Sequence, residues 1–343
     1  MSDLRPSGVE FDGAAQLLAS ARARLLAATA DLGLPDGQRL SDRQRHVVRS
    51  IAARLARAIE DELRSALAEA LPGDEIRAAL TSSQVEIALP ILEASGALIS
   101  PGFVEILLRR AEEHRLHRPG ASENALLIDL AGDADEAIAG EAMGLLIARS
   151  SRFDSFGDPV LARSDLPAEL EHRLVWTVAA ALRRYAVERH DADPPLVDES
   201  LSAAAARLLA GYDEGDGFEA RSLRLARLLR DSGRLDDAVT VRALSDAGLP
   251  LLVAILSVRT GLDAPAVWQI HLAGSPRGST LLLRGAGIAR DHAGAIFLAL
   301  GAEEAQLVSQ LAVYDSASEA EARRLLTLWA TDPGYRAAVA RLT

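Results

Sequence analysis

Apolar residues recur at helical spacing along most of the chain. In residues 43–71 they average about 3.6 positions apart, which predicts one long amphipathic helix. Ser41 and Gln44 fit a capping box that would start this helix. A shorter helix is predicted over residues 14–32, and a loop rich in helix breakers at residues 33–37 separates the two. The pattern therefore predicts an N-terminal helical hairpin.

Residues 82–118 predict two shorter helices joined by a turn. Ser83 and Glu86 fit a second capping box, so the first of the two helices should begin there. Pro90 would then lie inside that helix and kink it, because it lacks an N–H and clashes with the preceding turn. Gly96 should end it.

The second helix should begin at Ser100 and Pro101, as N-cap and first helical residue. A helix pair this short cannot bury its own apolar face. It therefore favours stacking against similar pairs, as in the HEAT-like repeats of an α-solenoid. The alternative is an ordinary helical hairpin inside a globular bundle.

The later part of the chain continues the helical pattern. A linker is predicted at residues 191–195, which read DADPP. From Gly248 and again from Gly287, a glycine, an apolar helix, a second glycine and an acid-led helix recur at a spacing of about 39 residues. With no strand pattern found, we expect an all-α fold. The expected domains are an N-terminal hairpin (1–75), HEAT-like repeats (76–195) and a C-terminal helical repeat region (196–343).

Composition narrows the chemistry available to the chain. It contains no cysteine, and all 37 basic residues are arginine, which excludes thiolate and lysine chemistry. A formal charge of -12 opposes binding to nucleic acid and to anionic membranes. No apolar segment reaches the roughly 20 residues of a membrane span, and the first residues lack the apolar core of a secretory signal. We expect a cytoplasmic protein without cofactors.

Two groups of histidines are the candidates for catalysis. His114 and His117 follow Glu112 and Glu113, but their spacing matches neither the HExxH motif of zinc proteases nor the ExxH motif of di-iron proteins, and helix C-termini favour histidine through the helix dipole. His46 lies among arginines on the long helix and invites comparison with phosphate-accepting histidines. We expect no metal site and no catalytic residue in either group.

The first half of the long helix is basic within an acidic protein. Most of its arginines lack acidic partners four residues further on, so they could bind an acidic partner; pairing within the helix is the alternative. The candidate binding residues are Arg43, Arg45, Arg49, Arg54 and Arg57.

The predicted hairpin also raises the question of dimerisation. Two helices shield only part of each other's apolar face, so a second copy could complete a four-helix bundle through residues 12–72. Docking of the hairpin onto the chain's own repeats is the alternative.

Several segments within residues 40–300 resemble a bacterial helical-repeat family, domain of unknown function 2336. They are LSDRQ from Leu40, IALPILEAS from Ile87, FVEILLRRAEEHR from Phe103, FGDPVLARSDLPAELEHRLVWTVAAALRRY from Phe156, and PRG from Pro276 leading to LLLRGAG. These are packing patterns, so the resemblance implies a fold but carries over no site.

We therefore expect a non-catalytic helical-repeat scaffold that binds another protein, in bacterial signalling or regulation. The alternative is a histidine phosphotransfer protein, or an enzyme acting on small molecules, that uses His46 or His114.

Overall fold

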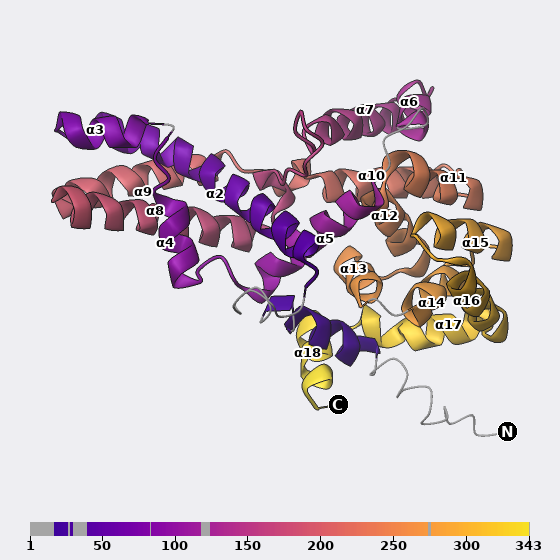
Figure 1. Ribbon diagram of the computed structural model, residues 1–343. Helices are drawn as coiled ribbons and strands as arrows, with labels where there is room; N and C mark the ends of the chain where they lie inside the picture. The colour runs from indigo at the N-terminus through magenta and orange to yellow at the C-terminus, as the bar shows by residue number, and fades with distance from the viewer. Residues whose placement is uncertain are drawn as a thin grey trace. The chain divides into compact units, whose positions relative to one another are not determined.

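The computed structural model describes residues 17–26, 28–29, 40–82, 84–117, 124–273 and 276–342 (Figure 1). Throughout these ranges the chain forms helices joined by turns. The extended pairing found in them is one isolated bridge between Phe153 and Pro159. The predicted all-α fold is confirmed.

Contacts divide the chain into two compact units. Unit 1 comprises Met1–Ala27, Glu112–Ser150 and Phe218–Thr343, and unit 2 comprises Ala28–Ala111 and Ser151–Gly217. Each unit is assembled from separate stretches of sequence. The domains expected at 1–75, 76–195 and 196–343 are each one continuous stretch, so they divide the chain in another way. They stay a prediction.

Unit 2 is organised around its longest helix, α2. This helix contacts α3, α4, α8 and α9. The elements of unit 2 are α2 (Asp42–Ala70), α3 (Asp74–Thr81), α4 (Ala88–Ser95), most of α5 (Pro101–Leu116), η1 (Arg163–Asp165), α8 (Ala168–His190), α9 (Pro194–Ala210) and η2 (Glu214–Asp216).

The start of α2 is the capping box predicted from the sequence. The Ser41 hydroxyl accepts from the Gln44 amide at 3.2 Å, and the Gln44 side chain accepts from the Ser41 amide at 3.3 Å. The apolar stripe of α2 is fully buried, with Ile51, Ile59 and Leu63 at 0 % exposure. One copy of the chain therefore already covers this stripe.

The shorter N-terminal helix contributes to a different core. Residues 17–26 are helical, and Leu17 and Leu18 are buried in unit 1. The predicted loop at residues 33–37 lies outside the described residues. Other helices of unit 2 cover α2, so α2 does not need a second copy of the chain to complete a bundle. The dimer through residues 12–72 stays a prediction.

Helix α4 begins later than the sequence predicts. Ser83 lies outside the described residues, and the helix starts at Ala88, so a start at the Ser83 capping box is wrong. The cap comes instead from α2, where the Glu60 carboxylate accepts from the Ile87 and Ala88 amides at 3.2 and 3.1 Å. Pro90 thus falls in the first turn, where proline is tolerated, and the predicted kink is also wrong.

The turn between α4 and α5 follows the prediction. Gly96 ends α4 in the left-handed conformation, with φ of 66°, which glycine adopts without strain. Helix α5 begins at Pro101. Further on, the predicted linker at residues 191–195 is a short turn, because α9 begins at Pro194 directly after α8 ends at His190.

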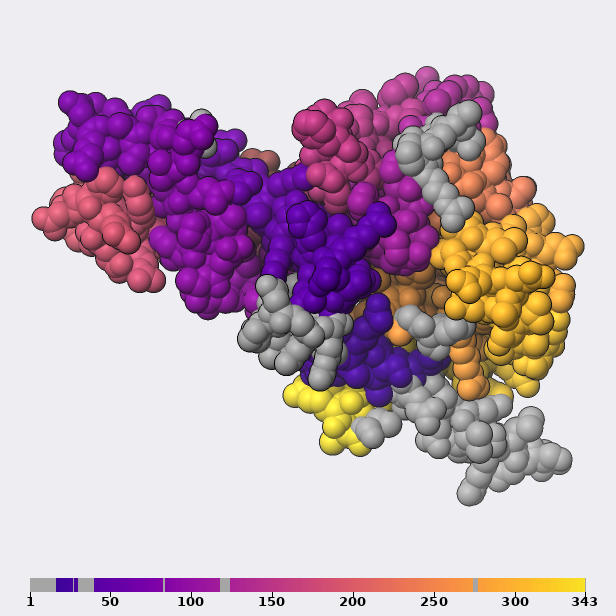
Figure 2. Space-filling model, in the orientation of Figure 1, coloured from indigo at the N-terminus to yellow at the C-terminus, as the bar shows by residue number. Residues whose placement is uncertain are grey.

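Unit 1 consists of shorter helices around two apolar clusters. Its labelled elements are α6 (Ala125–Ala131), α7 (Glu136–Ser150), α10 (Phe218–Asp231), α11 (Asp237–Arg242), the π-helical turn η3 (Ala243–Ala247), α12 (Leu249–Thr260), α13 (Ala264–Leu272), α14 (Pro276–Gly285), α15 (Arg290–Ala299), α16 (Glu304–Ser316), α17 (Glu319–Leu326), η4 (Thr327–Ala330) and α18 (Pro333–Leu342). Helices α15 and α16 contact each other, and the amber part of the chain that contains them forms one continuous surface in Figure 2.

The weak repeat detected in the sequence is visible locally. Gly248 precedes α12 and Gly261 separates it from α13; Gly287 precedes α15 and Gly301 separates it from α16. All four glycines have positive φ, between 68° and 98°. The two segments therefore form equivalent helix pairs, whereas their stacking into a solenoid stays a prediction.

Within the described ranges, no single helix is long and apolar enough to cross a bilayer; α12 and α13 meet that length and composition only as a pair bent by 116°.

Candidate functional site

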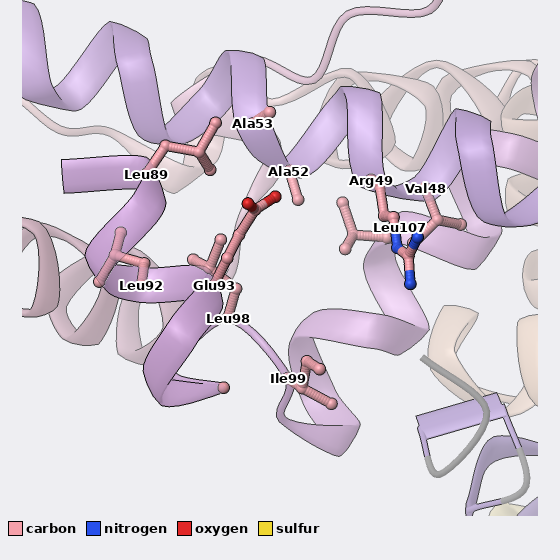
Figure 3. Close-up of a pocket in the computed structure, with 11 residues that line it drawn as sticks. Val48, Arg49, Ala52, Ala53, Leu89, Leu92, Glu93, Leu98, Ile99 and Leu107 are labelled. Carbon is pink, nitrogen blue, oxygen red and sulfur yellow. The ribbon is translucent and has the colours of Figure 1, made fainter. Parts of the chain in front are cut away.

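An apolar groove lies between α2, α4 and α5 in unit 2 (Figure 3). Its volume is about 290 Å³. Nine of the residues that line it are uncharged, namely Val48, Ala52, Ala53, Leu89, Leu92, Gly96, Leu98, Ile99 and Leu107. Concave apolar surfaces of this size are typical of sites that bind small molecules or the side chains of a partner.

Two side chains of opposite charge complete the lining. Arg49 reaches in from α2 and Glu93 from α4, and Figure 3 shows the Glu93 carboxylate extending toward α2. Both residues are exposed. The groove can therefore bury an apolar group of a ligand, while Arg49 and Glu93 interact with the polar groups next to that apolar group.

Small residues and a tight turn explain why the groove is open. Ala52 and Ala53 present only methyl groups from α2, so no long side chain fills the space toward α4. The left-handed Gly96 turns the chain sharply after α4, and Leu98 and Ile99 of the following loop line the groove. The lining thus follows from one helix face and one turn.

A buried ion pair fixes α4 to α2. Glu60 and Arg64 lie one turn apart on α2 with 3.2 Å between carboxylate and guanidinium. Besides Glu60, Arg64 donates to the carbonyls of Leu80, Ser82 and Val85 at 2.7 to 2.9 Å. Burial raises the pKa of Glu60, although the amides that it caps and Arg64 oppose this change. This arrangement holds the wall of the groove in place.

Three of the five arginines proposed from the sequence have carboxylate partners within the chain. Arg45 pairs with Asp42 at 2.8 Å and is itself buried. Arg57 pairs with Glu86.

Arg54 binds two carboxylates of one loop. Its guanidinium contacts Asp154 at 2.7 Å and Asp158 at 2.8 Å. The sequence suggested only partners on the same helix, whereas a loop about a hundred residues later supplies both carboxylates. Arg43 is exposed, and Arg49, which also interacts within the chain, lines the groove.

The histidine candidates lie on two different helices. His46 is exposed on α2, and His114 is half-buried in the last turn of α5. In the part of the chain that the structure describes, no group of three or more acidic or histidine side chains could hold a metal ion.

Glu112, from the same predicted cluster, instead joins an ion pair in unit 1. Arg115 donates to it at 2.8 and 2.7 Å, and His271 lies 3.4 Å away. Burial alone would raise the pKa of Glu112, but the hydrogen bonds and charges of Arg115 and His271 lower it to about 2. This carboxylate has a structural role at the end of α5.

The groove was not predicted from the sequence. Leu89, Leu92 and Leu107 are apolar residues at helical spacing, which usually indicates packing residues. The signal for the groove in the sequence was a pair of adjacent small residues, Ala52 and Ala53, on the face of α2 that meets a helix pair.

The described chain is thus an all-α protein with an apolar groove. A family model for a bacterial protein described as uncharacterised, domain of unknown function 2336, matches residues 120–327, so the chain belongs to this family. The match begins after the groove and leaves out the resembling segments between residues 40 and 119. No curated protein and no solved structure matches the chain.

Proposed function

We propose that this chain is a non-catalytic helical-repeat scaffold that binds another protein in the bacterial cytoplasm, in signalling or regulation. The groove between α2, α4 and α5 is the proposed binding site. The observation that carries the proposal is a preformed apolar concavity of about 290 Å³ with a charged residue on each of two walls.

The chemistry of the groove favours an apolar side chain of a partner as its occupant. Burying one large apolar side chain contributes about 1.5 to 3 kcal/mol, and such anchors commonly dominate protein interfaces. Arg49 and Glu93 would select among apolar segments by the charges beside the anchor. The glycine-separated helix pairs of unit 1 are consistent with a repeat scaffold.

Filling the groove tests the proposal. In Ala53→Trp a large ring replaces a methyl group on the wall of the groove and occupies the space for an anchor. Tagged wild-type and variant chains are expressed in the native bacterium, and the proteins that they retain are compared by quantitative mass spectrometry. We expect at least one protein to be retained by the wild type and lost by Ala53→Trp.

Ala206→Trp is the matched control, because Ala206 is an exposed alanine on α9 of the same unit. This control should retain the same proteins as the wild type, and circular dichroism should show unchanged helicity in both variants. Identical sets of retained proteins for the wild type and Ala53→Trp would contradict the proposal.

A further inference from the structure

A tight turn in unit 2 holds a phenyl ring in the solvent. Phe156 is 89 % exposed at the tip of residues 154–158. The Asp154 carboxylate accepts from the amides of Phe156 and Asp158, both at 2.9 Å, and Gly157 takes a positive φ of 79°. These bonds specify the conformation of the turn itself.

The turn is also anchored to a rigid element. Arg54 on α2 binds both aspartates of the turn at 2.7 and 2.8 Å. Single exposed apolar residues are common on protein surfaces and need no explanation. Here, two ion pairs and two internal hydrogen bonds fix the turn that presents the ring. Such preorganisation lowers the entropy cost of binding.

The groove of the same unit is large enough for this ring. Cavities of about 150 Å³ accept a benzene molecule, so the groove of about 290 Å³ has room for a phenyl ring and part of its backbone. Phe156 does not line the groove of its own chain.

Charge favours one orientation of the turn in the groove. The turn carries Asp154 and Asp158 against the cation of Arg54, so it is net acidic. On the groove side, Arg49 lines the α2 wall, Arg43 is exposed nearer the start of the same helix, and Glu93 lines the α4 wall. The aspartates of an entering turn would be attracted to the arginines of α2 and repelled by Glu93, so they should face α2.

We propose that Phe156 of one copy of the chain inserts into the groove of a second copy, so that the protein self-associates through this contact. The proposal rests on the groove being a protein-binding site and names its occupant. Ring and groove are different surfaces of unit 2, so each copy offers one of each, and one contact uses the ring of one copy and the groove of the other. This contact differs from a four-helix bundle through residues 12–72.

Analytical ultracentrifugation of the full chain over a wide concentration range tests the proposal. The wild type should show a mass that rises with concentration. Phe156→Ser removes the ring and Ala53→Trp fills the groove, and each should weaken association by at least about 30-fold, the size expected for loss of a hot-spot contact.

Mixing the two variants gives the decisive measurement. The Phe156→Ser chain keeps an intact groove, and the Ala53→Trp chain keeps its ring, so an equimolar mixture should form a mixed pair although neither variant associates alone. Recovery in the mixture also shows that both variants are folded. Leu98→Asp, on another wall of the groove, serves as a second groove variant.

Ile147→Ser is the matched control, because Ile147 is an apolar residue of α7 in unit 1 with 67 % exposure. It should associate as the wild type does. A wild type that stays monomeric at all concentrations, or variants that associate normally, would overturn the inference. If the wild type is monomeric but Ala53→Trp still loses a retained protein, self-association fails while the proposed function stands.

Discussion

The two units fill their cores with different kinds of side chain. In unit 1, Trp268, Trp329, Tyr314 and Phe297 are at most 1 % exposed. In unit 2 the largest fully buried side chains are branched aliphatics of α2 and the guanidinium-bearing Arg110. Large rings close the gaps between short helices, whereas aliphatic residues and alanines leave space between them.

Two pockets, one in each unit, differ in size. A pocket among helices α12 to α15 of unit 1 has a volume of about 20 Å³, too small for any ligand larger than water. The groove of unit 2 is more than ten times larger. The groove can therefore take a large side chain, which this pocket of unit 1 cannot.

Buried arginines also organise unit 2. Arg64 connects the end of α3 and the start of α4 to α2. Arg110 of α5 donates to the carbonyls of Arg152 and Val160, and it lies 4.6 Å from the ring of Phe153. The flat guanidinium offers five donors in fixed directions, which a lysine ammonium cannot imitate.

The largest expected effect is the loss of stability on removing a buried arginine from unit 2. Arg64→Met should lower the free energy of unfolding by about 3 to 5 kcal/mol, because it leaves Glu60 and several carbonyls buried without their partner. Chemical denaturation with urea measures the change.

Arg43→Met, at an exposed position of the same helix, is the control and should change the free energy by less than about 0.5 kcal/mol. Equal effects of the two substitutions would show that the buried arginine does not organise unit 2.

The second prediction concerns a carboxylate of unit 1. The pKa of Glu112 falls from an ordinary value of 4.5 to about 2 on folding, so its ionised form stabilises the fold above pH 4.5. This contribution, about 3 kcal/mol, should be lost as the pH falls from 4.5 through 2. Urea unfolding across this range measures it, and Glu112→Gln should flatten the dependence.

Glu60 of unit 2 should show the opposite sign. Because burial raises its pKa above 4.5, its contribution is complete below pH 4.5 and is lost as the pH rises through the folded value. The wild type should therefore lose stability as the pH rises toward neutral, and the Glu60→Gln variant should not show this loss. If both glutamine variants flatten the same side of the profile, the contrast between the two carboxylates is wrong.

The smallest expected effect is at the start of α2. Ser41→Ala removes the hydroxyl that accepts from the Gln44 amide and should cost about 1 kcal/mol. Thermal unfolding, followed by circular dichroism, detects this loss. Ser41→Asp should retain most of the stability, because a carboxylate also caps a helix and favours its N-terminus. A full loss in both variants would mean that the hydroxyl does not act as the cap.

Local signals in the sequence predicted local structure well. The cap at Ser41, the left-handed Gly96 and the start of α5 at Pro101 all depend on residues within one turn of each other, and the structure confirms them. The all-α class follows from the same periodicity.

What the sequence did not predict depends on distant residues. The cap of α4 is Glu60, 28 positions before Ala88, so the nearer Ser83 and Glu86 were misleading. The partners of Arg54 lie 100 and 104 residues away. The groove likewise requires knowing which face of α2 meets α4 and α5, and periodicity alone does not give this.

The division of unit 2 into two stretches of sequence has a consequence during synthesis. The apolar stripe of α2 is covered partly by α8 and α9, and α9 ends only at residue 210. At 5 to 20 residues per second, roughly 7 to 28 seconds separate the emergence of residue 70 from that of residue 210. Throughout this interval the nascent chain exposes the face that α8 and α9 will cover. We expect molecular chaperones to bind α2 at this stage.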